Sequence, residues 1–229
     1  MPKKIVRKTL LLVFTLLMGY LAIAAIWAWA VIDGAVASYP VVDDAPLTRN
    51  QIKMVFAIED PDFLRHKGLS LAQGQGKATI TSAVTTNALL YRRDMAGIKG
   101  VFQTMYRGVF ACCKRIDLGR DAMTLVVSAK VSKEKQLAMY AYDVYLGTEN
   151  GRQIRGLEQG ALAYAKMPLS KMSNAQFAGL VAMIKAPNLY HPTRHPEAYR
   201  QRLARVQLIV TRSCMPDGLF DTTYAHCAP

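Results

Sequence analysis

Two carboxylates stand side by side in this sequence, and residues of distinct chemistry follow them at short intervals. Glu59 and Asp60 are followed by Phe63, His66 and Gly68, in the order E-D-x-x-F-x-x-H-x-G. A carboxylate held in a site can take a proton from an attacking hydroxyl group, and a neutral histidine can join proton transfer or serve as a hydrogen-bonding partner. The plainer interpretation is a capping or surface pair, because Glu-Asp before Pro is common at helix starts.

Hydroxyl and basic side chains come next in the chain. Lys77, Thr79 and Thr81 open an apolar segment, and Arg92 and Arg93 follow it. Threonine hydroxyls in such a place can bond phosphates or cap the helix, and we leave both interpretations open. Basic side chains can neutralise phosphate charge, but with a net charge of +13 a solvated basic face is the favoured interpretation for any single one of them.

The N-terminal part of the chain predicts a membrane anchor. Residues 9–31 carry no charge, and a helix of about 20 such residues crosses the hydrocarbon layer. The basic residues that precede them are Lys3, Lys4, Arg7 and Lys8. The positive-inside rule places this end in the cytoplasm and the chain after about Asp33 outside the membrane. A signal peptide cleaved near residues 35–37 is the alternative, but signal h-regions usually run only about 7–15 residues.

Beyond the anchor, residues 1–33, we expect one mainly helical domain at 34–212 and a tail at 213–229. Ser132 and Ser173 are predicted helix N-caps, and Gly147 a helix stop. The basic stretch from Arg92 to Arg120 is expected to be a loop or a membrane-facing insert. Apolar spacing predicts helices at 79–91, 121–131, 132–146, 156–166, 173–186 and 196–212.

The four cysteines fit an oxidising compartment. Cys214 and Cys227 bracket a turn-rich segment, and a bridge between them is favoured, although four cysteines allow three connectivities. Cys112 and Cys113 are adjacent, so each needs a partner elsewhere or stays free. Structural zinc is disfavoured because no pair has the usual two-to-four-residue ligand spacing.

Taken in order, the motifs resemble the peptidoglycan glycosyltransferases, family 51 of the glycosyltransferases. The first block matches in full, and G-K-A-T-I-T at residues 76–81 matches part of the family's G-x-S-T-I-T-Q-Q. Residues 132–147 resemble S-K-x-x-I-L-E-L-Y-x-N-x-V-Y-L-G, and residues 180–192 resemble L-A-x-x-x-K-A-P-x-x-Y-x-P. Any one block would be weak evidence, but the series in family order is specific.

The resemblance implies a lysozyme-like, mainly α-helical domain behind one transmembrane helix in the bacterial inner membrane. Such a domain lies on the periplasmic or extracellular side and polymerises lipid II onto a growing glycan strand. Glu59 matches the base, and Asp60, Phe63, His66, Gly68 and Pro187 match structural positions. The candidates for binding substrate or pyrophosphate are Lys77, Thr79, Thr81, Arg92, Arg93 and Arg120. Penicillin-binding or other cell-wall synthesis proteins are the expected partners, and nucleic acid is not.

Several departures from the family pattern matter. The family's second catalytic glutamate falls on Arg120, with Asp121 beside it and Asp117 nearby, and the usual lysine of the second block is Thr86. Asp121 or Asp117 can replace the glutamate, or Arg120 can act as a cation on the pyrophosphate. The divalent cation that some members use, magnesium or manganese, is less secure without that glutamate. A degenerate lipid II-binding protein and a lytic hydrolase remain alternatives, and a monofunctional enzyme is favoured.

Overall fold

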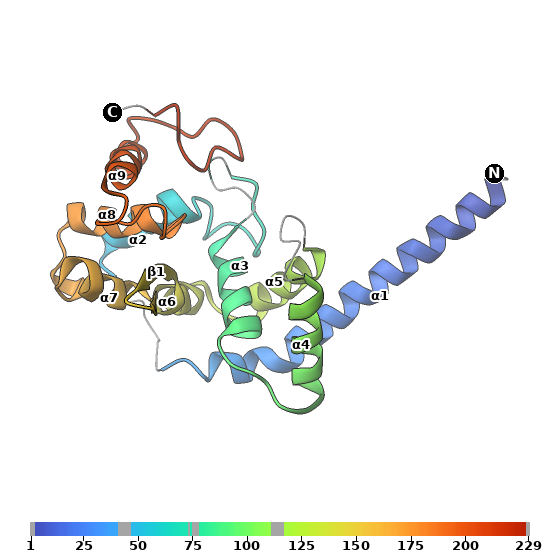
Figure 1. The fold of residues 1–229 in the computed structure, drawn as a ribbon. Helices are drawn as coiled ribbons and strands as arrows, with labels where there is room; N and C mark the ends of the chain where they lie inside the picture. The colour runs from blue at the N-terminus through green and yellow to red at the C-terminus, as the bar shows by residue number, and fades with distance from the viewer. Residues whose placement is uncertain (1–2, 41–46, 73, 75–77, 111–116, 228–229) are drawn as a thin grey trace. The chain divides into compact units, whose positions relative to one another are not determined.

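The computed structural model describes residues 3–40, 47–72, 74, 78–110 and 117–227 of the chain. Within these ranges the fold is mainly helical (Figure 1), which confirms the predicted fold class. The chain forms two compact units. The first unit joins Met1–Pro40 to Thr85–Lys130, and the second joins Val41–Val84 to Val131–Pro229.

In the first unit, the long helix α1 packs against shorter helices near its C-terminal end. The elements are α1 (Lys3–Val36), the π-helix η1 (Thr86–Tyr91), α4 (Gly97–Phe110) and α5 (Leu118–Lys130). Residues Lys4–Val36 are long and apolar enough to cross a membrane. The side chains of Ala28, Val31 and Ile32 are buried where α1 meets α5 and η1. The long apolar helix therefore extends beyond the predicted residue 33, and its last turns belong to a packed core.

Helix α4 corrects one of the two expectations for the stretch from Arg92 to Arg120, because residues Gly97–Phe110 form a helix and not a loop. The other expectation, a membrane-facing insert, stays a prediction. Helix α4 is amphipathic, and Gln103 on its buried side donates hydrogen bonds to the carbonyl oxygens of Leu89 (2.7 Å) and Arg93 (3.0 Å). The opposite face exposes four large apolar side chains at helical spacing: Ile98, Val101, Met105 and Val109.

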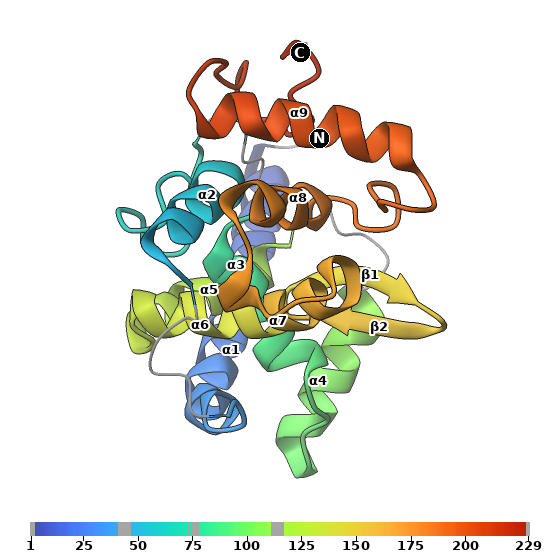
Figure 2. The ribbon, with the colours of Figure 1, turned by 90° about the vertical axis from the view of Figure 1, so that its left-hand side faces the viewer.

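The second unit is built around a buried helix, α8 (Asn174–Ile184), which contacts both α2 (Arg49–Glu59) and α9 (Pro196–Val210). Phe177 and Val181 of α8 are fully buried. Figure 2 shows α9 lying across α8. The remaining helices described in this unit are α3 (Ile80–Thr85), α6 (Lys133–Asp143), α7 (Leu157–Gly160), the π-helix η2 (Ala161–Ala165) and the 3-10 helix η3 (Leu169–Lys171).

Side-chain caps fix where several of these helices begin. Ser132 and Ser173 accept hydrogen bonds from the N–H groups of Lys135 and Gln176, which confirms both predicted N-caps. Thr48 forms a reciprocal capping box with Gln51 at the start of α2, a helix that the sequence analysis did not predict.

A β-hairpin replaces the end of the helix predicted for residues 132–146. Helix α6 ends at Asp143, and β1 (Tyr145–Glu149) pairs antiparallel with β2 (Arg152–Arg155). The turn holds Asn150 and Gly151 at φ of 50° and 77°. An Asn-Gly turn with positive φ at both residues suits a two-residue hairpin. The turn signal and the aromatic Tyr145 outweigh the helical spacing here.

Candidate active site

Glu59 is the last residue of α2, and its carboxyl group faces a pocket of the second unit. The buried side chains of Met54, Val55 and Ile58 fix the rotation of α2 and therefore the direction of Glu59. The pocket has a volume of about 190 Å³. It is lined by Ile58, Glu59, Gly74, Ala78, Ile184, Lys185, Arg202, Thr222 and Tyr224.

Helix α6 supplies the hydrogen-bonding partner of the carboxylate. The hydroxyl of Tyr140 donates to Oε2 of Glu59 over 3.1 Å. Burial raises the pKa of Glu59, while Arg202, the Tyr140 hydrogen bond and Lys185 oppose that rise. A carboxylate with a raised pKa accepts a proton more readily than an ordinary surface glutamate. Glu59 is thus a half-buried carboxylate that lines the pocket and is chemically able to accept a proton.

Two basic side chains flank this carboxylate. Burial lowers the pKa of Lys185, and the Arg202 charge adds to that effect, while Glu59 opposes it. Arg202 is almost fully buried, at 2% exposed. One carboxylate between two cations leaves the pocket with a net positive charge, which favours an anionic ligand. The same donor set does not suit magnesium or manganese, which prefer several oxygen ligands, so we derive no step through a metal.

The sequence analysis did not assign Tyr140, Lys185 or Arg202 to the site. Lys185 and Tyr140 stand inside matched motif blocks, so their positions were visible, but the bond from Tyr140 to Glu59 and the place of Lys185 in the same pocket were not. Arg202 stands on α9 without a spacing signal, and only the packing of α9 against α2 brings it to the pocket.

Asp60 and His66 form a buried structural pair next to Glu59. Asp60 is fully buried, and its carboxylate accepts hydrogen bonds from Nε2 of His66 (2.9 Å) and from the N–H of Ile80 (2.9 Å). Nδ1 of His66 accepts from the N–H of Gly68 (2.9 Å), which leaves Nε2 as the donor. The Asp60 carboxylate and the His66 ring therefore hold the loop after α2 against the start of α3.

The other residues of the first motif also hold this loop. Phe63 is buried and packs against Phe56, with a ring separation of 5.2 Å. Gly68 has φ of 103°, a conformation that favours glycine. Pro187 follows the end of α8, where a proline cannot continue the helix.

Thr79 and Thr81 are buried and make hydrogen bonds within the protein. The hydroxyl of Thr79 donates to the carbonyl of Gly68 (2.6 Å) and accepts from the N–H of Ser82 (2.9 Å). The hydroxyl of Thr81 donates to the side-chain oxygen of Gln136 (2.7 Å). Of the two interpretations of Thr79, this geometry favours the helix cap. Lys77 lies outside the described residues.

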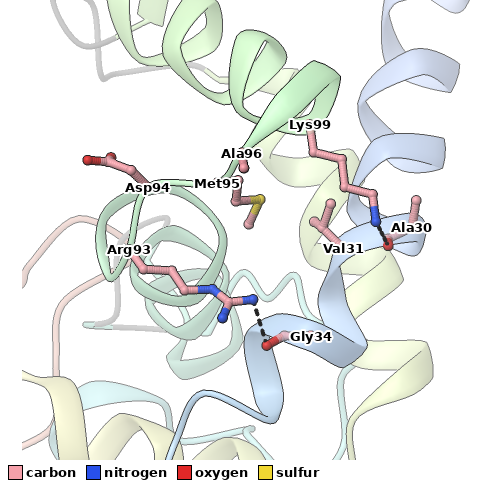
Figure 3. A pocket seen from close by; sticks show the side chains of 8 residues that line it. All are labelled: Ala30, Val31, Gly34, Arg93, Asp94, Met95, Ala96 and Lys99. Atoms are coloured by element: carbon pink, nitrogen blue, oxygen red, sulfur yellow. Dashed lines mark hydrogen bonds between the residues drawn. The ribbon is translucent and has the colours of Figure 1, made fainter.

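Arg92 and Arg93 belong to the first unit, where they bind the end of α1. Arg92 donates to the carbonyl of Ser38 (3.3 Å) and stacks on the ring of Tyr39 (4.0 Å to its centre). Arg93 donates to the carbonyl of Gly34 (2.9 Å). Gly34, Arg93 and Lys99 line a separate cavity of about 330 Å³ (Figure 3). These cations satisfy carbonyl groups that the end of a helix leaves without partners.

Arg120 and Asp121 stand in the first turn of α5, also in the first unit. Their charged groups lie 3.7 Å apart. The carboxylate of Asp117, just before the helix, accepts from the N–H of Arg120 (2.9 Å) and from the hydroxyl of Tyr106. Asp117 therefore acts as the cap of α5, whereas the side chain of Asp121 is one-third exposed.

Cys214 and Cys227 are joined in a disulfide, the pairing that the sequence favoured. With His226 they form the cluster of potential metal ligands found among the described residues. The disulfide occupies both sulfur atoms, so this cluster has no thiolate to offer a metal. Cys112 and Cys113 lie outside the described residues.

Comparison with known proteins supports the motif series. Residues 35–211 match the model of a family described as Transglycosylase. Penicillin-binding protein 1B of Escherichia coli is 30% identical over 180 residues, which cover 76% of this chain and 20% of that protein. Penicillin-binding protein 1B of Haemophilus influenzae is 32% identical over 174 residues, 74% of this chain and 21% of that protein. This chain thus spans about a fifth of the length of these relatives. The chain belongs to the transglycosylase family.

Proposed function

We propose that this protein is a membrane-anchored peptidoglycan glycosyltransferase that polymerises lipid II into glycan strands and releases polyprenyl pyrophosphate. The proposal rests on the carboxyl group of Glu59, which lines a pocket together with Lys185 and Arg202. Burial in this pocket raises the pKa of the carboxyl group. A base beside cations suits a reaction in which a hydroxyl attacks and a pyrophosphate leaves.

In the proposed reaction a sugar hydroxyl of one substrate attacks the anomeric carbon of another. Glu59 takes the hydroxyl proton as the new glycosidic bond forms, and the bond between the anomeric carbon and the pyrophosphate breaks. The departing pyrophosphate keeps the bonding electron pair, and nearby cations stabilise its growing charge. Lys185 and Arg202 are cations of this pocket, and Arg120, Arg92, Arg93 and Lys77 remain further candidates. Asp121 remains the candidate for the missing second carboxylate.

The membrane part of the proposal rests on the first unit. Helix α1 carries basic residues at its start and exposed apolar side chains, such as Leu10 and Phe14, along its first half. The positive-inside rule favours a cytoplasmic N-terminus, and the second unit then lies on the periplasmic or extracellular side. The exposed apolar stripe of α4 supports a membrane-facing role for that helix. Penicillin-binding proteins are proposed partners in the same pathway of wall synthesis.

The test is polymerisation of labelled lipid II by the purified full-length protein in detergent. Wild type, Glu59→Gln and Glu134→Gln are compared, since Glu134 is an exposed carboxylate on α6. We expect glycan strands from wild type and Glu134→Gln, and none from Glu59→Gln. Lipid II binding without strands from any of the three would refute turnover and make this a binding relative of the family.

A further inference from the structure

The C-terminal loop, residues 213–227, follows the segment that matches the family model, which ends at residue 211. The Cys214–Cys227 disulfide closes this loop. Its far end is held in the second unit, because Tyr224 and Cys227 are both buried. The loop is therefore a packed part of the fold.

The loop reaches the backbone and the basic residue that surround Glu59. The hydroxyl of Tyr224 donates to the carbonyl of Ile58 (3.3 Å), the residue before Glu59. The guanidinium group of Arg202 donates to the carbonyl of Thr222 (3.0 Å) and lies over the Tyr224 ring, 4.6 Å from its centre. Thr222 and Tyr224 also line the pocket.

A second attachment holds the opposite side of the pocket. The N–H of Gly74, another lining residue, donates to the carbonyl of Gly218 (2.9 Å). A Cβ atom at Gly74 would lie 2.5 Å from the ring of Pro216, and Gly74 has φ of 73°, so this close approach requires glycine. The loop thus bridges two segments of the pocket wall.

Tyr224 adopts a backbone conformation that is rare for a bulky residue. Its φ is 53°, in the left-handed region. Such a conformation persists only where the surroundings hold it, and it is frequent at functional sites. Here the cost is offset by burial of the ring against Arg202, which places that cation in the pocket.

Burial of Arg202 makes the loop electrostatically important. An arginine buried this fully needs partners, and the loop supplies a carbonyl group and an aromatic face. Without the loop, water would reach the guanidinium group and screen its attraction for the Glu59 carboxylate. The other groups that act on Glu59 are Tyr140 of α6, Lys185 after α8, and Asp60.

We propose that the C-terminal loop forms a functional part of the wall of the Glu59 pocket. The loop holds Arg202 in position beside Glu59 and thereby helps to bind the anionic part of the substrate. Tyr224 is then a positioning residue that acts through Arg202. The inference rests on the proposed function of the same pocket and adds a segment beyond the family match to it.

The experiment compares four variants of the full-length protein with wild type in detergent. Cys214→Ser/Cys227→Ser opens the loop, and Tyr224→Leu removes the ring under Arg202. Tyr224→Phe keeps the ring under Arg202 and removes the hydroxyl that bonds to Ile58. Phe220→Ala changes an exposed side chain of the same loop. Thermal unfolding selects the variants that remain folded. Binding of fluorescent lipid II, kcat, KM and the pH profile of kcat/KM are then measured.

We expect the opened loop and Tyr224→Leu to weaken lipid II binding and raise KM about tenfold, as expected for loss of a charge-assisted contact. The pH profile of Tyr224→Leu should shift so that, as the pH falls, activity is lost at a higher pH than in wild type, because Arg202 then favours the charged form of Glu59 less strongly. Tyr224→Phe should restore most of the binding and the wild-type profile. Phe220→Ala should match wild type.

Each failure has its own signature. If wild type binds lipid II without polymerising it, the proposed function fails, and the binding comparison still decides whether the loop matters. Wild-type affinity in a folded protein with an open loop would overturn the loop proposal whether or not turnover occurs. Absence of lipid II binding by wild type would overturn both proposals.

Discussion

The hydroxyl of Tyr140 donates a hydrogen bond to the carboxylate of Glu59 over 3.1 Å, which joins the middle of α6 to the end of α2. This contact links two motif blocks that are 81 residues apart in the sequence. It also acts directly on the proposed base, because a hydrogen bond to the charged form of a carboxylate lowers its pKa.

Replacing Tyr140 with phenylalanine should shift the pH dependence of turnover. Without the hydroxyl, the pKa of Glu59 rises further, and the acidic limb of kcat/KM moves to higher pH. A shift of one pH unit would lower the rate about tenfold on that limb. Tyr142→Phe is the control, since Tyr142 is an exposed tyrosine on the same helix. An unchanged limb in Tyr140→Phe would mean that Glu59 is not the group that titrates.

Glu59→Gln should stabilise the protein at neutral pH while it removes activity. Burial raises the pKa of Glu59 in the folded state, so the ionised form costs folding free energy above that pKa. The stability that Glu59→Gln gains over wild type should be greatest above the pKa of Glu59 in the folded state. It should shrink as the pH falls through that pKa and vanish below the ordinary pKa of 4.5. In a domain of this size 1 kcal/mol raises Tm by about 2–4 °C.

Thermal unfolding at several pH values between 8 and 4 checks this prediction. Glu134→Gln serves as the control because its carboxylate is exposed, and its Tm should stay close to wild type throughout. A Tm difference between Glu59→Gln and wild type that is independent of pH would contradict the prediction.

The sequence predicted the helical class, the long apolar N-terminal helix and two capping serines because each depends on local pattern. It missed α4, since its apolar stripe, which includes Ile98 and Val101, lies within a basic stretch. The hairpin was missed although the Asn150-Gly151 turn signal was visible. Arg202 and Tyr224 could not have been assigned to the pocket, because only tertiary packing brings α9 and the C-terminal loop to Glu59.

The Asp60–His66 pair should contribute far more stability than a surface pair of the same loop. His66→Ala removes one of the two hydrogen-bonding partners described above for the buried Asp60 carboxylate and leaves the N–H of Ile80. Loss of a buried partner of this kind costs about 3 kcal/mol of stability. Arg65→Ala breaks the exposed Arg65–Asp62 pair and should cost under about 0.5 kcal/mol. Chemical denaturation measures both. Equal losses of unfolding free energy in the two variants would show that the buried pair stabilises the fold no more than the exposed pair.

Substitutions at Asp121 and Asp117 should separate an effect on catalysis from an effect on helix capping. If Asp121 replaces the missing glutamate, Asp121→Asn should lower kcat about a hundredfold and leave Tm unchanged, since its pair with Arg120 is partly exposed. Asp117→Ala removes the cap of α5 and should cost about 1 kcal/mol of stability. The measurements are lipid II turnover and thermal unfolding. Full activity in Asp121→Asn would leave Arg120 as the group to test, with Arg120→Glu.

The exposed stripe of α4 should contact lipid. Ile98, Val101 and Met105 lie on one face and are among the most exposed apolar side chains described, with Ile98 at 86%. Benzoylphenylalanine introduced at Val101 should cross-link to phospholipid on illumination of the full-length protein in liposomes, whereas the same group at Glu134, an exposed polar position on α6, should react far less. Mass spectrometry of the adducts measures both. Equal labelling at the two positions would mean that α4 does not orient its stripe toward the bilayer, and the apolar face would then need a protein partner to cover it.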